Sequence, residues 1–239
     1  DSAGGVGSYP SLAIDSNNNP HIAYIDWSNK DLKYAEWTGS AWITQIVDSG
    51  DIPYAFNFMY PSIALDSDNN PHITYKNSTN TIKYAARSSA GIWSISTIAS
   101  GNQSSIAIDS SNNIHILFVN MTKSSNPTNY SLIHAVLGPG LTKEEIDYAV
   151  NPSSKVIIRL DSSGGYSALY TSNKSYLIYN KAGIKETIIY DPDDYSLALD
   201  DNDDAHIVYI FYPNITYMRK TASGWYSKVL DSANPGTSI

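Results

Sequence analysis

Cysteine is absent from the sequence, and arginine and glutamate are scarce, with three and four residues among 239. The absence of cysteine excludes disulfide bonds and thiolate metal sites. It does not identify a compartment, because a chain of this length can build a core without cross-links. No stretch of about 18 apolar residues occurs, so we expect no helical membrane span. The net charge is -8 without a basic cluster, which argues against a nucleic-acid partner.

Tyrosine, by contrast, is abundant, with 19 residues, and Asn, Ser and Thr are concentrated between short apolar runs. This composition is typical of many short strands joined by polar turns. It is also common on the exterior of microbial cells, and six Asn-x-Ser/Thr sequons are present. We therefore expect an extracellular or cell-surface location and leave open whether any sequon is glycosylated.

A 14-residue motif recurs along the chain. Its first copy, Ser11 to Tyr24, reads SLAIDSNNNPHIAY, and three similar copies begin at Ser62, Ser105 and Ser196. A divergent fifth copy, Ile157 to Tyr170, reads IIRLDSSGGYSALY. The Asp of the motif recurs at intervals of 39 to 52 residues, which indicates five repeats of one structural unit.

Each repeat contains four strand-like runs, which in the first repeat read SLAID, HIAYI, LKYA and WITQIV. Four short strands in a period of about 40–50 residues are the pattern of a β-propeller blade. We predict an all-β fold, a five-bladed β-propeller of four-stranded antiparallel blades, as a single domain over residues 1–239. The blades are expected at approximately 9–50, 60–101, 103–151, 154–191 and 194–231. The run Leu141 to Val150 has some helical character, but it occupies the place of a fourth strand and is predicted as one.

The alternation of side chains predicts two different faces for each blade. Ser, Ala, Asp and His positions form a small face, while Leu, Ile and the final aromatic residue of the motif form a bulky face. In the first hairpin we expect Asp15 opposite His21 and Leu12 opposite Tyr24. The bulky face of one blade should then pack against the small face of its neighbour.

Asp and His recur six residues apart in four of the five repeats. A ring of such pairs could provide acid/base catalysis or bind metal. A pair that recurs in nearly every blade is better explained by architecture, with Asp accepting turn N–H groups and His bonded to that Asp or to a carbonyl. We favour this structural interpretation for Asp15, His21, Asp66, His72, Asp109, His115, Asp200 and His206.

Two Asp-rich turns could bind Ca²⁺ through oxygen ligands. The stronger candidate contains Asp200, Asp201 and Asp203. Both turns lack the Gly and the distal Glu of an EF-hand loop, so a solvated hairpin turn is the preferred interpretation. We accordingly expect no cofactor, with Ca²⁺ as the alternative.

The fourth repeat departs from the motif, since Arg159 replaces the small Ala of the first strand and Ser167 replaces His. First strands line the central channel of a propeller, so Arg159 would be a rare cation near the axis of an acidic protein. It could bind an anionic ligand group bidentately. Alternatively, it fills the volume that the missing His leaves and pairs with a neighbouring Asp.

Aromatic residues are concentrated in the connections that share one face of the predicted blades. Exposed rings among Asn, Asp and Ser suit sugar recognition by stacking and hydrogen bonding. The alternative is that these rings fold back and plug the core. The candidates for ligand contact are Trp27, Tyr54, Tyr60 and Tyr212, together with Arg159.

The repeat S-[LI]-A-[IL]-D-x4-[PIA]-H-I-x-[YF] resembles repeats of secreted and cell-surface β-propeller proteins of bacteria and archaea. These are related in style to the Asp-box (BNR) propellers of the sialidase superfamily. The resemblance implies the propeller fold. The turn here reads D-S-x-N-N-x-H rather than as an Asp-box, and two of the three arginines fall on outer strands, so sialidase activity is not expected.

These observations favour a secreted or cell-surface binding module that recognises a glycan or another surface protein. The first alternative is a glycoside hydrolase or polysaccharide lyase with its site at the channel mouth. It is less favoured because none of the four Glu residues falls on a predicted inner strand. The second is a purely structural envelope repeat. We expect a monomeric domain, or part of a longer chain.

Overall fold

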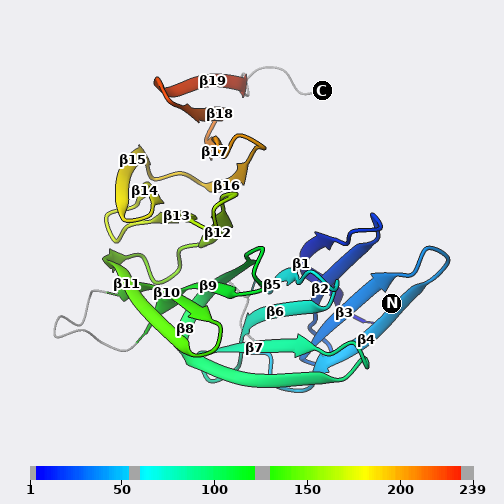
Figure 1. The fold of residues 1–239 in the computed structure, drawn as a ribbon. Coiled ribbons are helices and arrows are strands. Elements are labelled where there is room, and N and C mark those ends of the chain that lie inside the picture. The colour runs from blue at the N-terminus through cyan, green and yellow to red at the C-terminus, as the bar shows by residue number, and fades with distance from the viewer. Residues whose placement is uncertain (1–3, 54–59, 122–129, 233–239) are drawn as a thin grey trace. The chain divides into compact units, whose positions relative to one another are not determined.

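The computed structural model describes residues 4–53, 60–121 and 130–232, and in these residues every regular element is a β-strand. The chain divides into two compact units, Asp1–Val156 and Ile157–Ile239, which are described separately here. No helix in the described ranges is long and apolar enough to cross a membrane. The expectation of an all-β chain of antiparallel strands is confirmed (Figure 1).

The first unit contains three four-stranded antiparallel meanders. The first meander consists of β1 (Val6–Ile14), β2 (Pro20–Asp26), β3 (Asp31–Trp37) and β4 (Trp42–Asp48). The second contains β5 (Ser62–Leu65), β6 (Pro71–Lys76), β7 (Thr81–Arg87) and the first half of β8 (Trp93–Ile108). The third contains the second half of β8 with β9 (Ile114–Asn120), β10 (Tyr130–Leu137) and β11 (Leu141–Val150).

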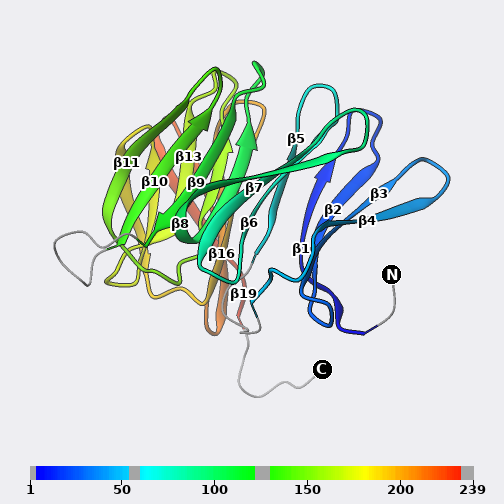
Figure 2. The ribbon, with the colours of Figure 1, turned by 90° about the horizontal axis from the view of Figure 1, so that it is seen from below.

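Strand β8 runs unbroken from the second meander into the third, although the sequence predicts a boundary between blades near residue 102 (Figure 2). Gly101 lies where the strand passes from one meander to the next. A Cβ at Gly101 would lie 2.6 Å from Ile82 Cγ1 and 2.9 Å from the carbonyl oxygen of Val119. The absence of a side chain therefore permits a close crossing, and the strand continues through it. The predicted strand Leu141–Val150 is confirmed as β11.

The second unit contains two further meanders of the same order. The fourth meander consists of β12 (Ile157–Leu160), β13 (Tyr166–Thr171), β14 (Tyr176–Lys181) and β15 (Ile184–Tyr190). The fifth consists of β16 (Asp194–Leu199), β17 (Ala205–Phe211), β18 (Asn214–Thr221) and β19 (Gly224–Ser232). Each meander corresponds to one sequence repeat.

The register of the first hairpin differs from the prediction. Ala13 pairs with His21, and Leu12 pairs with Ile22 rather than with Tyr24. Asp15 is not opposite His21, because its N–H donates to the carbonyl oxygen of Asn19 at 2.9 Å and so closes a tight turn. The shift amounts to two residues, so every side chain keeps its predicted face.

This tight turn explains the Asn-rich sequence between the first two strands. Asn18 has a φ of 64°, in the left-handed region that Asn and Gly tolerate best. The equivalent residues of the other repeats also have positive φ: Asn69, Asn112, Gly164 and Asp203. The glycine of the divergent repeat therefore preserves the turn.

The predicted packing of bulky face against small face is confirmed within each unit. Ala23, on the small face of the first meander, lies in one core cluster with Ile73 and Tyr75 of the second. Leu169 of the fourth meander packs in the same way with Ile207 and Tyr209 of the fifth. The final aromatic residue of the motif is buried in all five repeats: Tyr24, Tyr75, Phe118, Tyr170 and Tyr209.

Candidate functional site

The recurring Asp of the motif stabilises its own turn. Asp15 accepts the backbone N–H groups of Asn17 at 2.8 Å and Asn19 at 2.7 Å. The Asn19 side-chain amide donates to the same carboxylate at 3.0 Å, and this contact is the main cause that lowers the pKa of Asp15 to about 2. The other repeats make equivalent contacts through Asp66, Asp109, Asp161 and Asp200.

The recurring His joins that turn to the third strand of the same meander. His72 Nε2 lies 3.3 Å from Asp66, and its Nδ1 bonds to the Tyr84 hydroxyl. His21 and His206 have the same arrangement, with Tyr34 and Tyr217 as the hydroxyl partners. In the third repeat His115 meets His134 instead, at 3.0 Å. These contacts recur within single meanders, as the structural interpretation expects, and a catalytic role is not tested by them.

A polar cavity of about 400 Å³ lies in the second unit, between the fourth and fifth meanders. Its volume falls within the range of about 300–1,000 Å³ that is typical of ligand pockets. Tyr179, Ile184, Ala205 and Ala222 supply apolar surface, and the other lining side chains are polar. The polar side chains come from β14, β15, β18 and the turn before β17: Lys181, Glu186, Asn202, Asp203, Asp204, Lys220 and Thr221.

Two residues of the cavity wall, Glu186 and Lys220, contact each other and the indole of Trp225, which lies outside the lining. Lys220 Nζ donates to both Glu186 carboxylate oxygens at 2.6 Å, and Trp225 Nε1 donates to Glu186 Oε2 at 2.7 Å. Lys220 Nζ also lies 5.2 Å from the centroid of the Trp225 ring. The Lys220 bond, more than any other contact, lowers the pKa of Glu186, so the carboxylate is ionised at neutral pH. We call these three residues the Glu186 cluster.

A related cluster occupies the corresponding place between the first and second meanders. Trp93 Nε1 donates to Gln45 Oε1 at 3.0 Å, as Trp225 does to Glu186. Arg87 pairs with Glu36 at 3.1 Å, as Lys220 pairs with Glu186. We call Glu36, Arg87, Trp93 and Gln45 the Glu36 cluster. In both places, a cation and a tryptophan of one meander therefore contact polar residues of the preceding meander.

The aromatic residues predicted for ligand contact lie elsewhere. Trp27 and Tyr60 both pack edge-on against Tyr9, with ring centroids 6.0 Å and 4.9 Å apart. Trp27 also packs against the core of the first unit, which agrees with the alternative that these rings fold back onto the core. Tyr60 remains partly exposed. Tyr54 lies outside the described residues.

The two other predicted contacts belong to the second unit, and neither lines the polar cavity. Tyr212 is exposed, and its backbone N–H donates to Asp193 Oδ2 at 2.9 Å. Arg159 is also exposed on β12, where its Nη1 donates to the carbonyl oxygen of Ile158 at 2.8 Å. A role for either residue in binding stays a prediction.

Two of the three predicted calcium ligands, Asp200 and Asp203, are engaged with protein groups. Asp200 contacts His206 and Arg219, at 3.1 Å and 3.2 Å. Asp203 accepts the N–H and hydroxyl of Ser162, at 2.8 Å and 2.6 Å. In the described ranges no group of three or more His, Asp and Glu side chains is placed to hold a metal ion. Calcium binding at Asp200, Asp201 and Asp203 stays an untested prediction.

The carboxylates of the cavity are each paired with a cation or a hydroxyl group. Glu186 is paired with Lys220, Asp204 with Arg219 at 2.9 Å, and Asp203 with Ser162. A glycosidase of the usual two-carboxylate kind needs one acid with a raised pKa. The pKa of Glu186 is lowered instead, which suits fixed hydrogen-bond acceptance and not proton donation.

Comparisons with known proteins identify the fold. No protein-family profile and no curated protein matches the sequence. Among solved structures, the SapL1 lectin in complex with alpha methyl fucoside matches with a TM-score of 0.69 and 14% identity, covering 99% of this chain and 83% of that chain. The fucose-specific lectin from Aleuria aurantia matches with a TM-score of 0.64 and 13% identity, over 92% and 76% of the two chains. The BP39L lectin from Burkholderia pseudomallei matches with a TM-score of 0.65 and 11% identity, over 94% and 71%.

The chain shares the fold of these β-propeller lectins. The resemblance to Asp-box propellers of the sialidase type is therefore corrected, since the structural similarity is to fucose-binding lectins. The motif suggested the wrong family because a tight turn around an Asp can close the hairpin of any antiparallel blade. Such a turn carries no information on the ligand.

The Glu186 cluster was missed by sequence reasoning. Trp93 and Trp225 were interpreted only as the first residues of strands. A usable signal exists, because each follows a basic residue, Arg87 or Lys220, across a glycine-containing turn. The acidic partner lies in the preceding repeat, and only the packing of two meanders brings it to the cation.

Proposed function

We propose that this chain is a glycan-binding lectin with five β-propeller blades, one for each repeat, and that the polar cavity beside Glu186 binds a neutral monosaccharide such as a fucose residue. The observation that carries the proposal is the preformed group of ionised acceptor, cation and apolar surface in a cavity of about 400 Å³. The fold shared with fucose-binding lectins supports the choice of sugar.

The chemistry of the cavity matches a pyranose. Hydroxyl groups of a sugar both donate and accept hydrogen bonds. An ionised Glu186 accepts them, and Lys220, Asn202 and Thr221 can donate them. Tyr179 and Ile184 offer apolar contact to the C–H groups of the ring. A surface protein would reach this cavity only through a small protruding group, so a glycan is the better ligand.

The charges of the cavity favour an uncharged sugar. Glu186 and Asp204 are paired with Lys220 and Arg219. Lys181, the other lysine of the lining, lies 3.7 Å from Asp161, so each of these cations already faces a carboxylate. A sialic acid or uronic acid carboxylate would lie close to three carboxylates, those of Glu186, Asp203 and Asp204. Repulsion between like charges then disfavours binding. A glycan ligand also fits the proposed extracellular or cell-surface location.

Calorimetric titration with methyl α-L-fucoside tests the proposal. Glu186→Gln and Lys220→Met should each weaken binding by about tenfold or more, because each removes a charge-assisted hydrogen bond worth about 1.5–3 kcal/mol. Lys228→Met, an exposed change on β19 outside the cavity, is the matched control and should bind like the wild type. Equal affinity in all four proteins would reject the cavity as the site. A wild type that binds neither fucoside nor any other neutral glycan would reject the function.

A further inference from the structure

The Asn-x-Ser/Thr sequons of the chain lie in different surroundings. N-glycosylation requires that the Asn side chain and the hydroxyl group two residues later be accessible, because the modifying enzyme must reach both. The sequons at Asn120 and Asn129 include residues outside the described ranges. The other sequons consist only of described residues, and they begin at Asn77, Asn102, Asn173 and Asn214.

The Asn77 side chain is enclosed by its own turn and is only 5% exposed. Its Nδ2 donates to Asp51 Oδ2 at 3.0 Å. Its Oδ1 accepts the N–H and the hydroxyl of Thr79, at 3.1 Å and 3.0 Å, and the N–H of Thr81 at 2.9 Å. The nitrogen that a glycan would join is therefore buried and bonded, and Asn77 is a structural residue of the turn.

The sequons at Asn102 and Asn214 both contain a buried hydroxyl residue. Asn102 lies within β8, where its Nδ2 donates to the carbonyl oxygen of Pro152. Ser104, the third residue of its sequon, is 6% exposed. Asn214 is the first residue of β18, and Thr216, the third residue of that sequon, is 7% exposed. An enzyme that must contact the hydroxyl group cannot use either sequon in the folded chain.

The Asn173 sequon forms the tight turn between β13 and β14. The Ser172 N–H donates to the carbonyl oxygen of Tyr176 at 2.8 Å, and the Ser175 N–H donates to the carbonyl oxygen of Ser172 at 2.9 Å. Asn173 and Lys174 therefore form the apex of the turn, and both are exposed. Ser175, the third residue of the sequon, is partly exposed beside them. A surface turn of this kind is where a bulky, hydrated glycan can be accommodated.

We infer that Asn173 is an N-glycosylation site of this chain. The sugar donor is a lipid-linked oligosaccharide, and the Asn173 Nδ2 replaces the lipid pyrophosphate at C1 of its first sugar. The C1–O bond breaks, a C1–N bond forms, the pyrophosphate leaves with the bonding electron pair, and Nδ2 loses one proton. No oxidant or reductant is needed. The inference rests on the proposed extracellular or cell-surface location and is independent of the glycan-binding function.

A glycan on Asn173 leaves the polar cavity accessible. The turn that carries Asn173 precedes β14, whereas Lys181 at the end of β14 and Ile184 at the start of β15 line the cavity. Strand β14 spans Tyr176–Lys181, so its two ends are about 17 Å apart at about 3.3 Å per residue. The modified turn and this part of the cavity therefore lie at opposite ends of the same strand.

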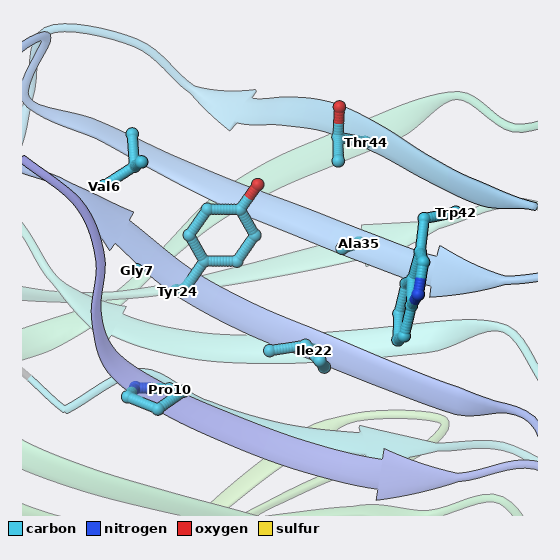
Figure 3. A pocket seen from close by; sticks show the side chains of 8 residues that line it. All are labelled: Val6, Gly7, Pro10, Ile22, Tyr24, Ala35, Trp42 and Thr44. Carbon is cyan, nitrogen blue, oxygen red and sulfur yellow. The ribbon is translucent and has the colours of Figure 1, made fainter. Parts of the chain in front are cut away.

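The first repeat contains no sequon. Its meander has an apolar hollow of about 270 Å³, which Ile22, Tyr24 and Trp42 help to line (Figure 3). A hydrated glycan attached beside this hollow would lie close to apolar surface without burying it from water. The sequons are confined to the other four repeats, and among those described completely only Asn173 lies at the apex of an exposed turn.

Enzymatic transfer to the folded chain tests the inference. The purified chain is incubated with a single-subunit oligosaccharyltransferase and a lipid-linked oligosaccharide, and mass spectrometry of its peptides identifies the modified Asn. We expect a glycan at Asn173 and none at Asn77, Asn102 or Asn214. Synthetic peptides of the four sequons are the control, and all should be accepted because they lack the contacts of the folded chain. Transfer to folded Asn77 or Asn102, or no transfer to folded Asn173, overturns the inference.

Variants of the two sequons in the second unit confirm the assignment. Asn173→Gln and Ser175→Ala should each abolish the transfer at residue 173, whereas the matched control Asn214→Gln should be modified like the wild type. Circular dichroism checks that each variant is folded. The glycosylated chain should bind methyl α-L-fucoside as tightly as the unmodified chain, and a tenfold loss would show that the glycan obstructs the cavity. Because the peptide map is read without fucoside, failure of the proposed function leaves the result at Asn173 unchanged.

Discussion

The Glu186 and Glu36 clusters lie at corresponding places in the two units, but their carboxylates have different surroundings. In the first unit, Glu36 accepts from the buried Tyr34 hydroxyl, which is bonded in turn to His21. In the second unit, Ser167 replaces the His, and the Tyr179 hydroxyl is bonded to that serine at 3.0 Å. The acidic residue of the second unit, Glu186, lies on the fourth strand of its meander, whereas Glu36 lies on the third. Glu186 borders a cavity of about 400 Å³. The carboxylate beside the tryptophan therefore borders a cavity in the second unit, whereas in the first unit Glu36 is bonded to a buried tyrosine.

The largest effect should follow from Trp225→Ala. This change removes the indole N–H that holds Glu186 and the ring that faces Lys220. We expect a loss of about 2 kcal/mol in the free energy of unfolding and a weakening of fucoside binding by at least tenfold. Urea denaturation and calorimetric titration measure the two effects. Unchanged affinity would show that Trp225 does not position the binding residues.

The matched change in the other cluster, Trp93→Ala, should separate stability from binding. Trp93 packs edge-on against Tyr34 with ring centroids 5.3 Å apart and donates to Gln45. Its loss should lower the free energy of unfolding by about 2 kcal/mol, since a half-buried aromatic contact and a hydrogen bond disappear. The affinity for fucoside should not change. If Trp93→Ala lost binding as strongly as Trp225→Ala, both clusters would be sites and the contrast between them would be wrong.

Removing the tyrosine hydroxyl beside each cluster tests how much the hydrogen bonds of that hydroxyl contribute to stability. Burial raises the pKa of Tyr34, so its hydroxyl stays protonated and donates to Glu36. Tyr34→Phe leaves both His21 and Glu36 short of a partner and should cost about 2 kcal/mol of stability. Tyr179→Phe affects a neutral pair only and should cost about 1 kcal/mol. Thermal or urea unfolding of the two variants gives the comparison, and equal costs would contradict it.

The smallest effect concerns the titration of Glu186. Its pKa is lowered from an ordinary value of 4.5, first by Lys220 and then by Trp225. The contribution of the ion pair to stability is therefore present above pH 4.5 and is lost as the pH falls through the lower, folded-state value. Carboxyl ¹³C shifts should show Glu186 titrating below 4.5 in the wild type and closer to it in Lys220→Met. A Glu186 pKa that does not respond to Lys220→Met would show that the bond contributes little.

The repeat motif predicted the strands and the faces because both depend on local alternation. The hairpin register was wrong by two residues, since the prediction treated the Asn-rich segment as a longer loop. Asp15 instead bonds to Asn19, and Asn18 adopts a left-handed conformation. The alternation of side chains alone does not show which residue closes a turn. The closure follows from the contacts of the Asp15 carboxylate with the N–H groups of Asn17 and Asn19.

The candidate site was harder to predict than the fold. Glu186 and Trp225 are separated by 39 residues and belong to different repeats, so no local motif contains both. The loop aromatics Trp27 and Tyr60 were chosen by composition. The structure places both against Tyr9 in the first unit, whereas residues of the second unit line the polar cavity. The candidate site belongs to the divergent repeat, in which Ser167 replaces the His and Glu186 contacts Lys220 of the next meander. The sequence drew attention to the fourth repeat through Arg159 and not through Glu186, and a role for Arg159 in binding stays a prediction.

The most direct test is a crystal structure of the chain soaked with methyl α-L-fucoside. The account predicts sugar density in the cavity between β15 and β18, with hydroxyl groups bonded to Glu186 and Lys220. Sugar bound at the Tyr9, Trp27 and Tyr60 cluster, with the cavity holding only water, would contradict it.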